Sequence, residues 1–224
     1  MKHKKLSLTK LIKKSIHLRY LLYLPGAYEK KPKKRWPLII FLHGSEERGD
    51  NLKKITHNGL PKLIEEGKEF PFIVVSPLCP RFINWVGLID ELYNLIQEIS
   101  NKFRVDNARI SVTGLSMGGT GAWYLGVRHP ELFAAIIPIS GDAPPMRGFP
   151  FRVKVLKDIP VWVFHGALDD VVPIKYSARM VDALKKYKGR VHFTVYPYAG
   201  HDAWSQTYRN PKFYKWLLKQ KKSR

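Results

Sequence analysis

One serine in this chain stands where a nucleophile would be expected, between two glycines in the segment 114–118, Gly-Leu-Ser-Met-Gly. Residues 109–113 predict a strand, and residues 120–127 predict a helix. A serine between a strand and a helix must lie on a tight turn, and the two glycines remove side chains that would clash there. The unpaired N–H groups at the helix N-terminus would then face any oxyanion that forms beside the serine. We therefore predict that Ser116 is a nucleophile; the alternative is a glycine-rich turn whose serine caps the helix.

A serine hydroxyl is a weak nucleophile at neutral pH, so it needs a base, and the base needs an orienting acceptor. His201 lies in a loop after the last predicted strand, and we predict that it is the general base. Asp169 and Asp170 share the loop after an earlier strand. We choose Asp169 as the orienting carboxylate, while Asp170 could instead cap the following helix. Asp142, at the end of another strand, remains the alternative acid.

The elements that must position these side chains alternate along the chain. Apolar strands alternating with helices predict a mainly parallel sheet covered by helices on both faces, with the chemistry at the carboxyl ends of the strands. His43 and His165 also end strands and precede glycines, where we expect them to brace loops. We predict strands over 16–24, 38–42, 72–75, 109–113, 134–139, 160–164 and 191–196, and helices within 60–67 and over 88–103, 120–127, 174–187 and 203–222, the last with a break at Pro211.

The order Ser116, Asp169, His201 and the motifs around these residues resemble an α/β-hydrolase of the carboxylesterase type. The group includes phospholipase/carboxylesterases, feruloyl esterases and the catalytic domain of prolyl oligopeptidase-like enzymes. The segments that carry the resemblance are 37–44 with 47–50, 112–119, 165–166 with 169 and 172–173, and 200–202 with 204. The resemblance implies Ser116 as nucleophile, Asp169 as acid and His201 as base, without a cofactor. It also implies an oxyanion hole formed by the backbone N–H groups of Met117 and Ser45.

The chain departs from this group after His43-Gly44, where relatives usually carry small residues, often a glycine second, and this chain has Ser45-Glu46. A carboxylate at this position could repel anionic substrates or reshape the loop. The longest insertion near the site, residues 141–158, leaves little room for a lid, so we expect an open cleft. Trp85 and Trp204 are candidates to line it, although buried packing is the simpler role for each.

Composition places the chain among ordinary globular proteins, and 224 residues suit one α/β-hydrolase domain over 1–224. The single cysteine, Cys79, cannot form an internal disulfide and suits a reducing compartment, so we expect a cytoplasmic protein. The basic N-terminus lacks the pattern of a signal peptide, and no apolar run is long enough to span a membrane. We find no cluster with metal-ligand spacing and expect no metal.

The formal net charge of +21 resides at the two ends of the chain. Residues 1–35 carry 12 Lys and Arg against Glu29, and residues 185–224 carry 11 against Asp202, which leaves the middle neutral. A solvated lysine-rich surface explains this distribution; weak electrostatic association with anionic polymers, without specific nucleic-acid binding, is the alternative.

Together these features predict a serine hydrolase that cleaves small or aromatic carboxylic esters through an acyl-enzyme. A peptidase or thioesterase of the same fold is the rival within the class. From another class, a non-catalytic binder could hold anionic polymers on the basic ends.

Overall fold

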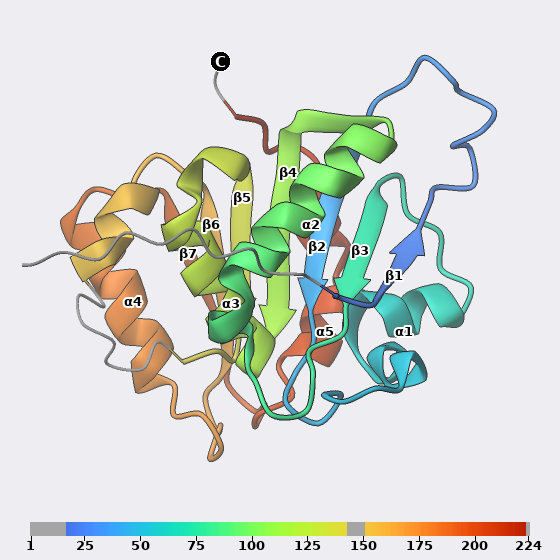
Figure 1. Cartoon of the computed structure of the whole chain (residues 1–224). Helices are drawn as coiled ribbons and strands as arrows, with labels where there is room; N and C mark the ends of the chain where they lie inside the picture. The colour runs from blue at the N-terminus through green and yellow to red at the C-terminus, as the bar shows by residue number, and fades with distance from the viewer. Residues whose placement is uncertain (1–16, 143–150, 223–224) are drawn as a thin grey trace, which may run out of the picture.

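A computed structural model of the chain describes residues 17–142 and 151–222, and its centre is one seven-stranded sheet (Figure 1). The strand order is β1-β3-β2-β4-β5-β6-β7. Only the edge strand β1 is antiparallel to its neighbour, and the other pairs are parallel. The strands are β1 (Tyr20–Tyr23), β2 (Trp36–Leu42), β3 (Ile73–Pro77), β4 (Val105–Leu115), β5 (Ala135–Ile139), β6 (Val161–Gly166) and β7 (Val191–Tyr196).

Helices cover both faces of the sheet. One face packs against α2, α3 and α4, which lie in front in Figure 1, and the other packs against α1, α5 and α6. The helices are α1 (Gly59–Glu65), α2 (Ile89–Lys102), α3 (Met117–Arg128), α4 (Lys175–Lys186), α5 (Trp204–Arg209) and α6 (Pro211–Leu217), with short 3₁₀ helices at Leu52–His57, Trp85–Leu88, Pro130–Leu132 and Phe151–Leu156.

The alternation of side chains along β2 explains why this strand is apolar throughout. Leu38, Ile40 and Leu42 enter the core beneath α2 and α3, whereas Ile39 and Phe41 enter the core beneath α1 and α5. All seven residues of β2 are buried, as expected for a central parallel strand with helices on both sides. The predicted parallel sheet with two covered faces is therefore confirmed.

Most predicted elements occur with small shifts at their ends. The first strand is shorter than predicted, because only Tyr20–Tyr23 pairs with β3, and it lies at the sheet edge as expected. Helix α3 begins at Met117, three residues before the predicted start, so its first turn follows the serine directly. The C-terminal helix breaks at Pro211 as predicted, because Asn210 caps the new helix by accepting the N–H of Lys212.

The insertion 141–158 is only partly described, since residues 143–150 lie outside the described ranges; the rest includes the 3₁₀ helix Phe151–Leu156. Within residues 17–142 and 151–222, none of the helices has both the length and the apolar character needed to span a bilayer.

Candidate active site

Ser116 occupies a strained turn between β4 and α3. Its φ of 52° and ψ of −120° lie in a region that residues with a side chain rarely adopt. Its N–H donates to the carbonyl of Ile139 at 2.9 Å, and its own carbonyl accepts the N–H of Thr120 at 3.1 Å. These two bonds tie the turn to β5 and to the first turn of α3.

The glycines on either side of Ser116 allow the backbone to approach closely. A Cβ at Gly118 would overlap the carbonyl oxygen of Leu42 at the end of β2. A Cβ at Gly114 would overlap the backbone of Gly118, which is the cross-turn clash expected from the sequence. Any larger residue at either position would push α3 away from the sheet.

Three side chains from separate elements meet above the carboxyl end of the sheet. The Nε2 atom of His201 lies 2.9 Å from Oγ of Ser116, and its Nδ1 lies 2.8 Å from Oδ2 of Asp169. A carboxylate oxygen accepts hydrogen bonds, so Nδ1 carries the proton and Nε2 is left to accept the Ser116 hydroxyl. The residues chosen from the sequence as nucleophile, base and acid are thus in one hydrogen-bonded line.

The carboxylate of Asp169 is fully buried and held at both oxygens. Its Oδ1 accepts the N–H groups of Val171 at 3.1 Å and Val172 at 2.8 Å, and its Oδ2 also lies 3.1 Å from Nε2 of His165. Burial lowers the pKa of His165, so this imidazole is neutral. It braces the loop, because its Nε2–H donates to the carbonyl of Val172 at 2.8 Å and its Nδ1 lies 2.8 Å from the Ser177 hydroxyl. The predicted structural role of His165 fits this position.

The two other candidate acids have different roles. Asp142 accepts a hydrogen bond from the Thr120 hydroxyl in α3, which occupies its carboxylate away from the base. Asp170 does not cap the following helix: α4 begins at Lys175 with no side-chain cap. The loop is closed instead by Asp169, whose Oδ1 accepts both backbone N–H groups.

Ser116 and His201 open into a cavity of about 320 Å³. Ser45 lines this cavity, while Met117 follows Ser116 as the first residue of α3, where N–H groups have no intrahelical acceptor. Trp204 also lines it, and its ring meets that of His201 edge to face at 5.1 Å. The cavity is lined by Gly44, Ser45, Glu46, Glu47, Asn58, Leu115, Ser116, Val171, His201, Asp202 and Trp204.

Trp85 does not line the cavity, which corrects one of the two tryptophan expectations. Its side chain is fully buried, and its indole N–H donates to the carbonyl of His43 at 2.9 Å. The ring also packs edge to face on the imidazole of His43 at 4.9 Å. Trp85 therefore supports the loop after β2 from beneath.

Asn58 lines the cavity, although no sequence pattern marked it as a site residue. Its side-chain amide donates to Oε1 of Glu47 at 2.6 Å, and its carbonyl accepts the indole N–H of Trp204 at 3.3 Å. Only the fold brings this residue, just before α1, against the loop after β2 and against α5.

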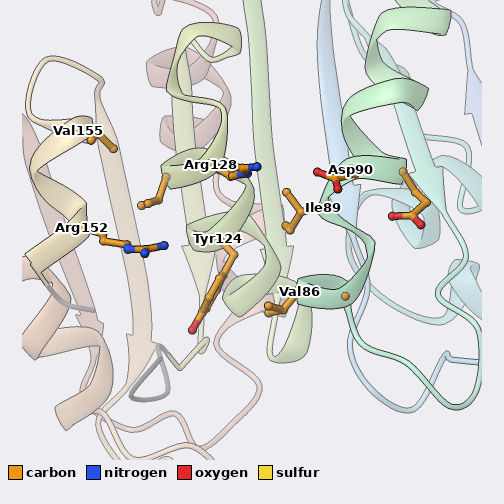
Figure 2. Close-up of a pocket in the computed structure, with 10 residues that line it drawn as sticks. Val86, Ile89, Asp90, Tyr124, Arg128, Arg152 and Val155 are labelled. Carbon is orange, nitrogen blue, oxygen red and sulfur yellow. The ribbon is translucent and has the colours of Figure 1, made fainter. Parts of the chain in front are cut away.

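A second, larger cavity of about 540 Å³ lies between α2, α3 and the 3₁₀ helix at 151–156 (Figure 2). In Figure 2, Arg152 and Val155 lie on its left side, Tyr124 and Arg128 of α3 lie in the middle, and Ile89 lies to the right. None of Ser116, Asp169 and His201 lines this cavity, so its size does not identify the reactive site.

Comparisons with known proteins also find similarity to hydrolases. The family model described as phospholipase/carboxylesterase matches residues 87–213, which is more than half of the chain. An acyl-protein thioesterase 1 homolog 2 of Dictyostelium discoideum is 37% identical over 82 residues, which are 36% of each chain. A putative carboxymethylenebutenolidase of Yersinia pestis is 29% identical over 108 residues, 46% of this chain and 40% of the relative. The matched part of this chain thus spans well under half the length of these curated relatives.

Solved structures share the fold over most of the chain. A thermostable esterase is 30% identical with a TM-score of 0.78, and the match covers 92% of this chain and 60% of the other. A ferulic acid esterase has a TM-score of 0.66 at 21% identity, with 88% of this chain and 92% of the other covered. At this identity the second likeness concerns the fold alone.

Proposed function

The chain belongs to the phospholipase/carboxylesterase family of α/β-hydrolases, and we propose that it is a serine esterase that works through an acyl-enzyme. The observation that carries the proposal is the line from Ser116 Oγ through both nitrogens of His201 to Oδ2 of Asp169, at 2.9 and 2.8 Å. These distances are within the reach that general-base activation of a hydroxyl requires.

In the proposed reaction, Nε2 of His201 takes the Ser116 proton while Oγ attacks the carbonyl carbon of an ester. The buried Asp169 carboxylate keeps the imidazole in the correct tautomer and stabilises the imidazolium. The backbone N–H groups of Met117 and Ser45 stabilise the tetrahedral oxyanion, with the first turn of α3 adding its positive dipole end. His201 then protonates the leaving alcohol and later activates the water that releases the acid.

The size and shape of the site favour small or aromatic acyl esters over interfacial lipids. The cavity of about 320 Å³ lies at the lower end of the range typical of small-molecule sites. Leu115 and Val171 provide apolar contact, and the Trp204 ring extends the wall beside the base. We infer that the substrate is a small-molecule ester and that the enzyme acts in the cytoplasm without a cofactor.

The test is a Ser116→Ala variant of the full chain assayed with p-nitrophenyl butyrate. We expect a folded protein whose kcat falls roughly 10⁴-fold or more, because the nucleophile is gone and only binding and oxyanion donors remain. A fluorophosphonate probe should label the parent at Ser116 and leave the variant unlabelled. Parent-like hydrolysis by the variant would show that another residue carries the reaction.

Thioester hydrolysis is the second candidate, and the acyl-protein thioesterase relatives favour it. The two activities are separated by presenting one acyl group on an alcohol and on a thiol and comparing kcat/KM. A non-catalytic binder of anionic polymers would hydrolyse neither substrate and would not be labelled by the probe.

A further inference from the structure

A second carboxylate, Glu47, lies beside the candidate nucleophile and has no part in the proposed proton transfer. It stands in the loop after β2 and lines the same cavity as Ser116 and His201. The residue is only 3% exposed. A carboxylate this deeply buried requires hydrogen-bond donors at its oxygens, so each oxygen must be accounted for.

Only one of the two Glu47 oxygens has a donor within the described part of the chain. Oε1 accepts the side-chain N–H of Asn58 at 2.6 Å. The other oxygen, Oε2, lies 3.9 Å from Nδ1 of His43, which is beyond hydrogen-bond distance.

The His43 ring cannot supply the missing donor, because both of its nitrogens are already engaged. Nδ1 lies 2.6 Å from the carbonyl of Gly44, which can only accept, so the proton on Nδ1 points there. Nε2 accepts the N–H of Cys79 at 3.0 Å. Burial lowers the pKa of His43 to about 4, so the ring is neutral at pH 7 and offers Glu47 no positive charge.

The absence of a side chain at Gly44 leaves Oε2 open toward the nucleophile. A Cβ built at Gly44 would lie 3.2 Å from Glu47 Oε2, 3.7 Å from Ser116 Cβ and 2.9 Å from the Leu115 side chain. The open oxygen and the candidate nucleophile are therefore neighbours on either side of Gly44, and Glu47 and Ser116 line the same cavity. An ester bound in that cavity with its carbonyl at Ser116 would bring the substituents next to the carbonyl toward Oε2.

We propose that Oε2 of Glu47 accepts a hydrogen bond from the substrate, and that the preferred substrates are esters with a hydroxyl or ammonium donor close to the scissile carbonyl. This inference rests on the proposed esterase function and adds the substrate class to it. The rest of the cavity agrees, since Glu46 and Asp202 also line it and none of its described lining residues is Lys or Arg. An anionic group would meet three carboxylates and no Lys or Arg side chain among the described lining residues, although the protein as a whole is strongly basic.

The test compares kcat/KM for matched esters that differ only in the donor. The series consists of an unsubstituted p-nitrophenyl ester and its analogues with a hydroxyl or a methoxy group on the second or third acyl carbon. A parallel series of alcohols places the same groups on the leaving side. We expect a hydroxyl ester to exceed its methoxy analogue by about tenfold or more, the scale of a hydrogen bond to a charged acceptor.

A Glu47→Gln variant changes the open atom and keeps the rest of the contact. The glutamine carbonyl can still accept from Asn58, while an NH₂ group replaces Oε2, so the site offers a donor where it offered an acceptor. We expect the hydroxyl-to-methoxy ratio to fall about tenfold toward unity. Glu46→Gln removes the same charge from the same cavity and should leave this ratio unchanged, because it leaves Oε2 in place.

Three results would overturn the inference. One is an unaltered protein that hydrolyses hydroxyl and methoxy esters equally on both sides of the bond, a comparison that needs no variant. Another is a Glu47→Gln variant that lowers kcat/KM for every ester by the same factor, which assigns Glu47 to holding the loop alone. Finally, if no ester is cleaved in a Ser116-dependent manner, the esterase function fails and this inference fails with it; Ser116-dependent cleavage without a hydroxyl preference removes only this inference.

Discussion

Asp169 places one carboxylate oxygen within hydrogen-bond distance of two imidazoles. We therefore expect its substitution to lower activity more than substitution of Asp142 does. Its Oδ2 lies 2.8 Å from Nδ1 of His201 and 3.1 Å from Nε2 of His165. Its Oδ1 is fixed by the N–H groups of Val171 and Val172, which require an oxygen at that position. The orientation of the carboxylate is therefore set by backbone and does not depend on substrate.

An Asp169→Asn variant should lose most of the activity while keeping the fold. The two backbone donors hold the amide oxygen at Oδ1, so the NH₂ group must face Nδ1 of His201 and favour the wrong tautomer. We expect kcat for p-nitrophenyl butyrate to fall roughly 10³- to 10⁴-fold. Asp142→Asn is the matched control and should stay within a few-fold of the parent, because Asp142 bonds Thr120. The opposite ranking of the two variants would make Asp142 the acid.

At the scale of the elements, the loops that carry the site are tied across strand ends by buried neutral histidines. His43 follows β2, and its Nε2 accepts the N–H of Cys79, two residues beyond β3. Trp85 closes the same corner by donating to the carbonyl of His43. These bonds position the loop of Ser45 and Glu47 and explain why a buried histidine stands at the end of an apolar strand.

The buried neutral imidazole of His43 predicts that the free energy of unfolding decreases at acidic pH. The pKa of His43 is lowered from 6.5 to about 4, so the unfolded chain binds a proton at a higher pH than the folded protein does. The contribution of His43 is fully present above pH 6.5 and is lost as the pH falls from 6.5 toward 4, by up to about 3 kcal/mol. The lowered pKa of His165 acts in the same direction.

Urea unfolding of the parent and of His43→Gln between pH 7.5 and pH 4.5 tests this effect. Glutamine can still accept the Cys79 N–H and does not titrate in this range, so the free energy of unfolding of the variant should decline less steeply with pH. Carboxylates titrate in both proteins, so the difference between the two curves isolates His43. Parallel curves would mean that the ring is not held neutral in the folded state.

At the scale of the whole molecule, charge and chemistry are separated. The formal charge of +21 comes from the first 35 and the last 40 residues. Most residues of the triad and the cavity belong to the neutral middle of the sequence, and the exceptions are His201, Asp202 and Trp204. The charged residues that line the cavity, within the described part of the chain, are acidic: Glu46, Glu47 and Asp202. We propose that the basic ends have at most a side role, the weak binding of anionic polymers.

Heparin chromatography tests whether the basic ends of the chain bind anionic polymers without affecting ester hydrolysis. We expect the protein to bind heparin at low salt and to elute in moderate salt, because exposed charges are screened beyond about 10 Å at 0.1 M salt. Hydrolysis of p-nitrophenyl butyrate should be the same with and without soluble heparin at matched salt. Strong inhibition by heparin, or retention that persists in high salt, would instead connect the basic ends with the site.

The sequence by itself determined the class of fold and the order of the candidate site residues. Apolar runs such as 38–42 are long enough and uniform enough to predict buried parallel strands, and the predicted sheet is confirmed. The glycines around Ser116 mark the turn because only a residue without a side chain fits against Leu42. Strand ends gather at one edge of such a sheet, so Ser116, Asp169 and His201 could be proposed together.

Only the tertiary structure decided which neighbours of these residues reach the cavity. Trp85 and Trp204 are equivalent in sequence terms, yet Trp85 is buried beneath His43 while Trp204 borders the base. The preference for Asp169 over Asp142 and Asp170, and the contact between Glu47 and Asn58, depend on distances between separate elements. Local sequence patterns report burial and turns within one segment, whereas these contacts arise from the packing of segments far apart in the chain.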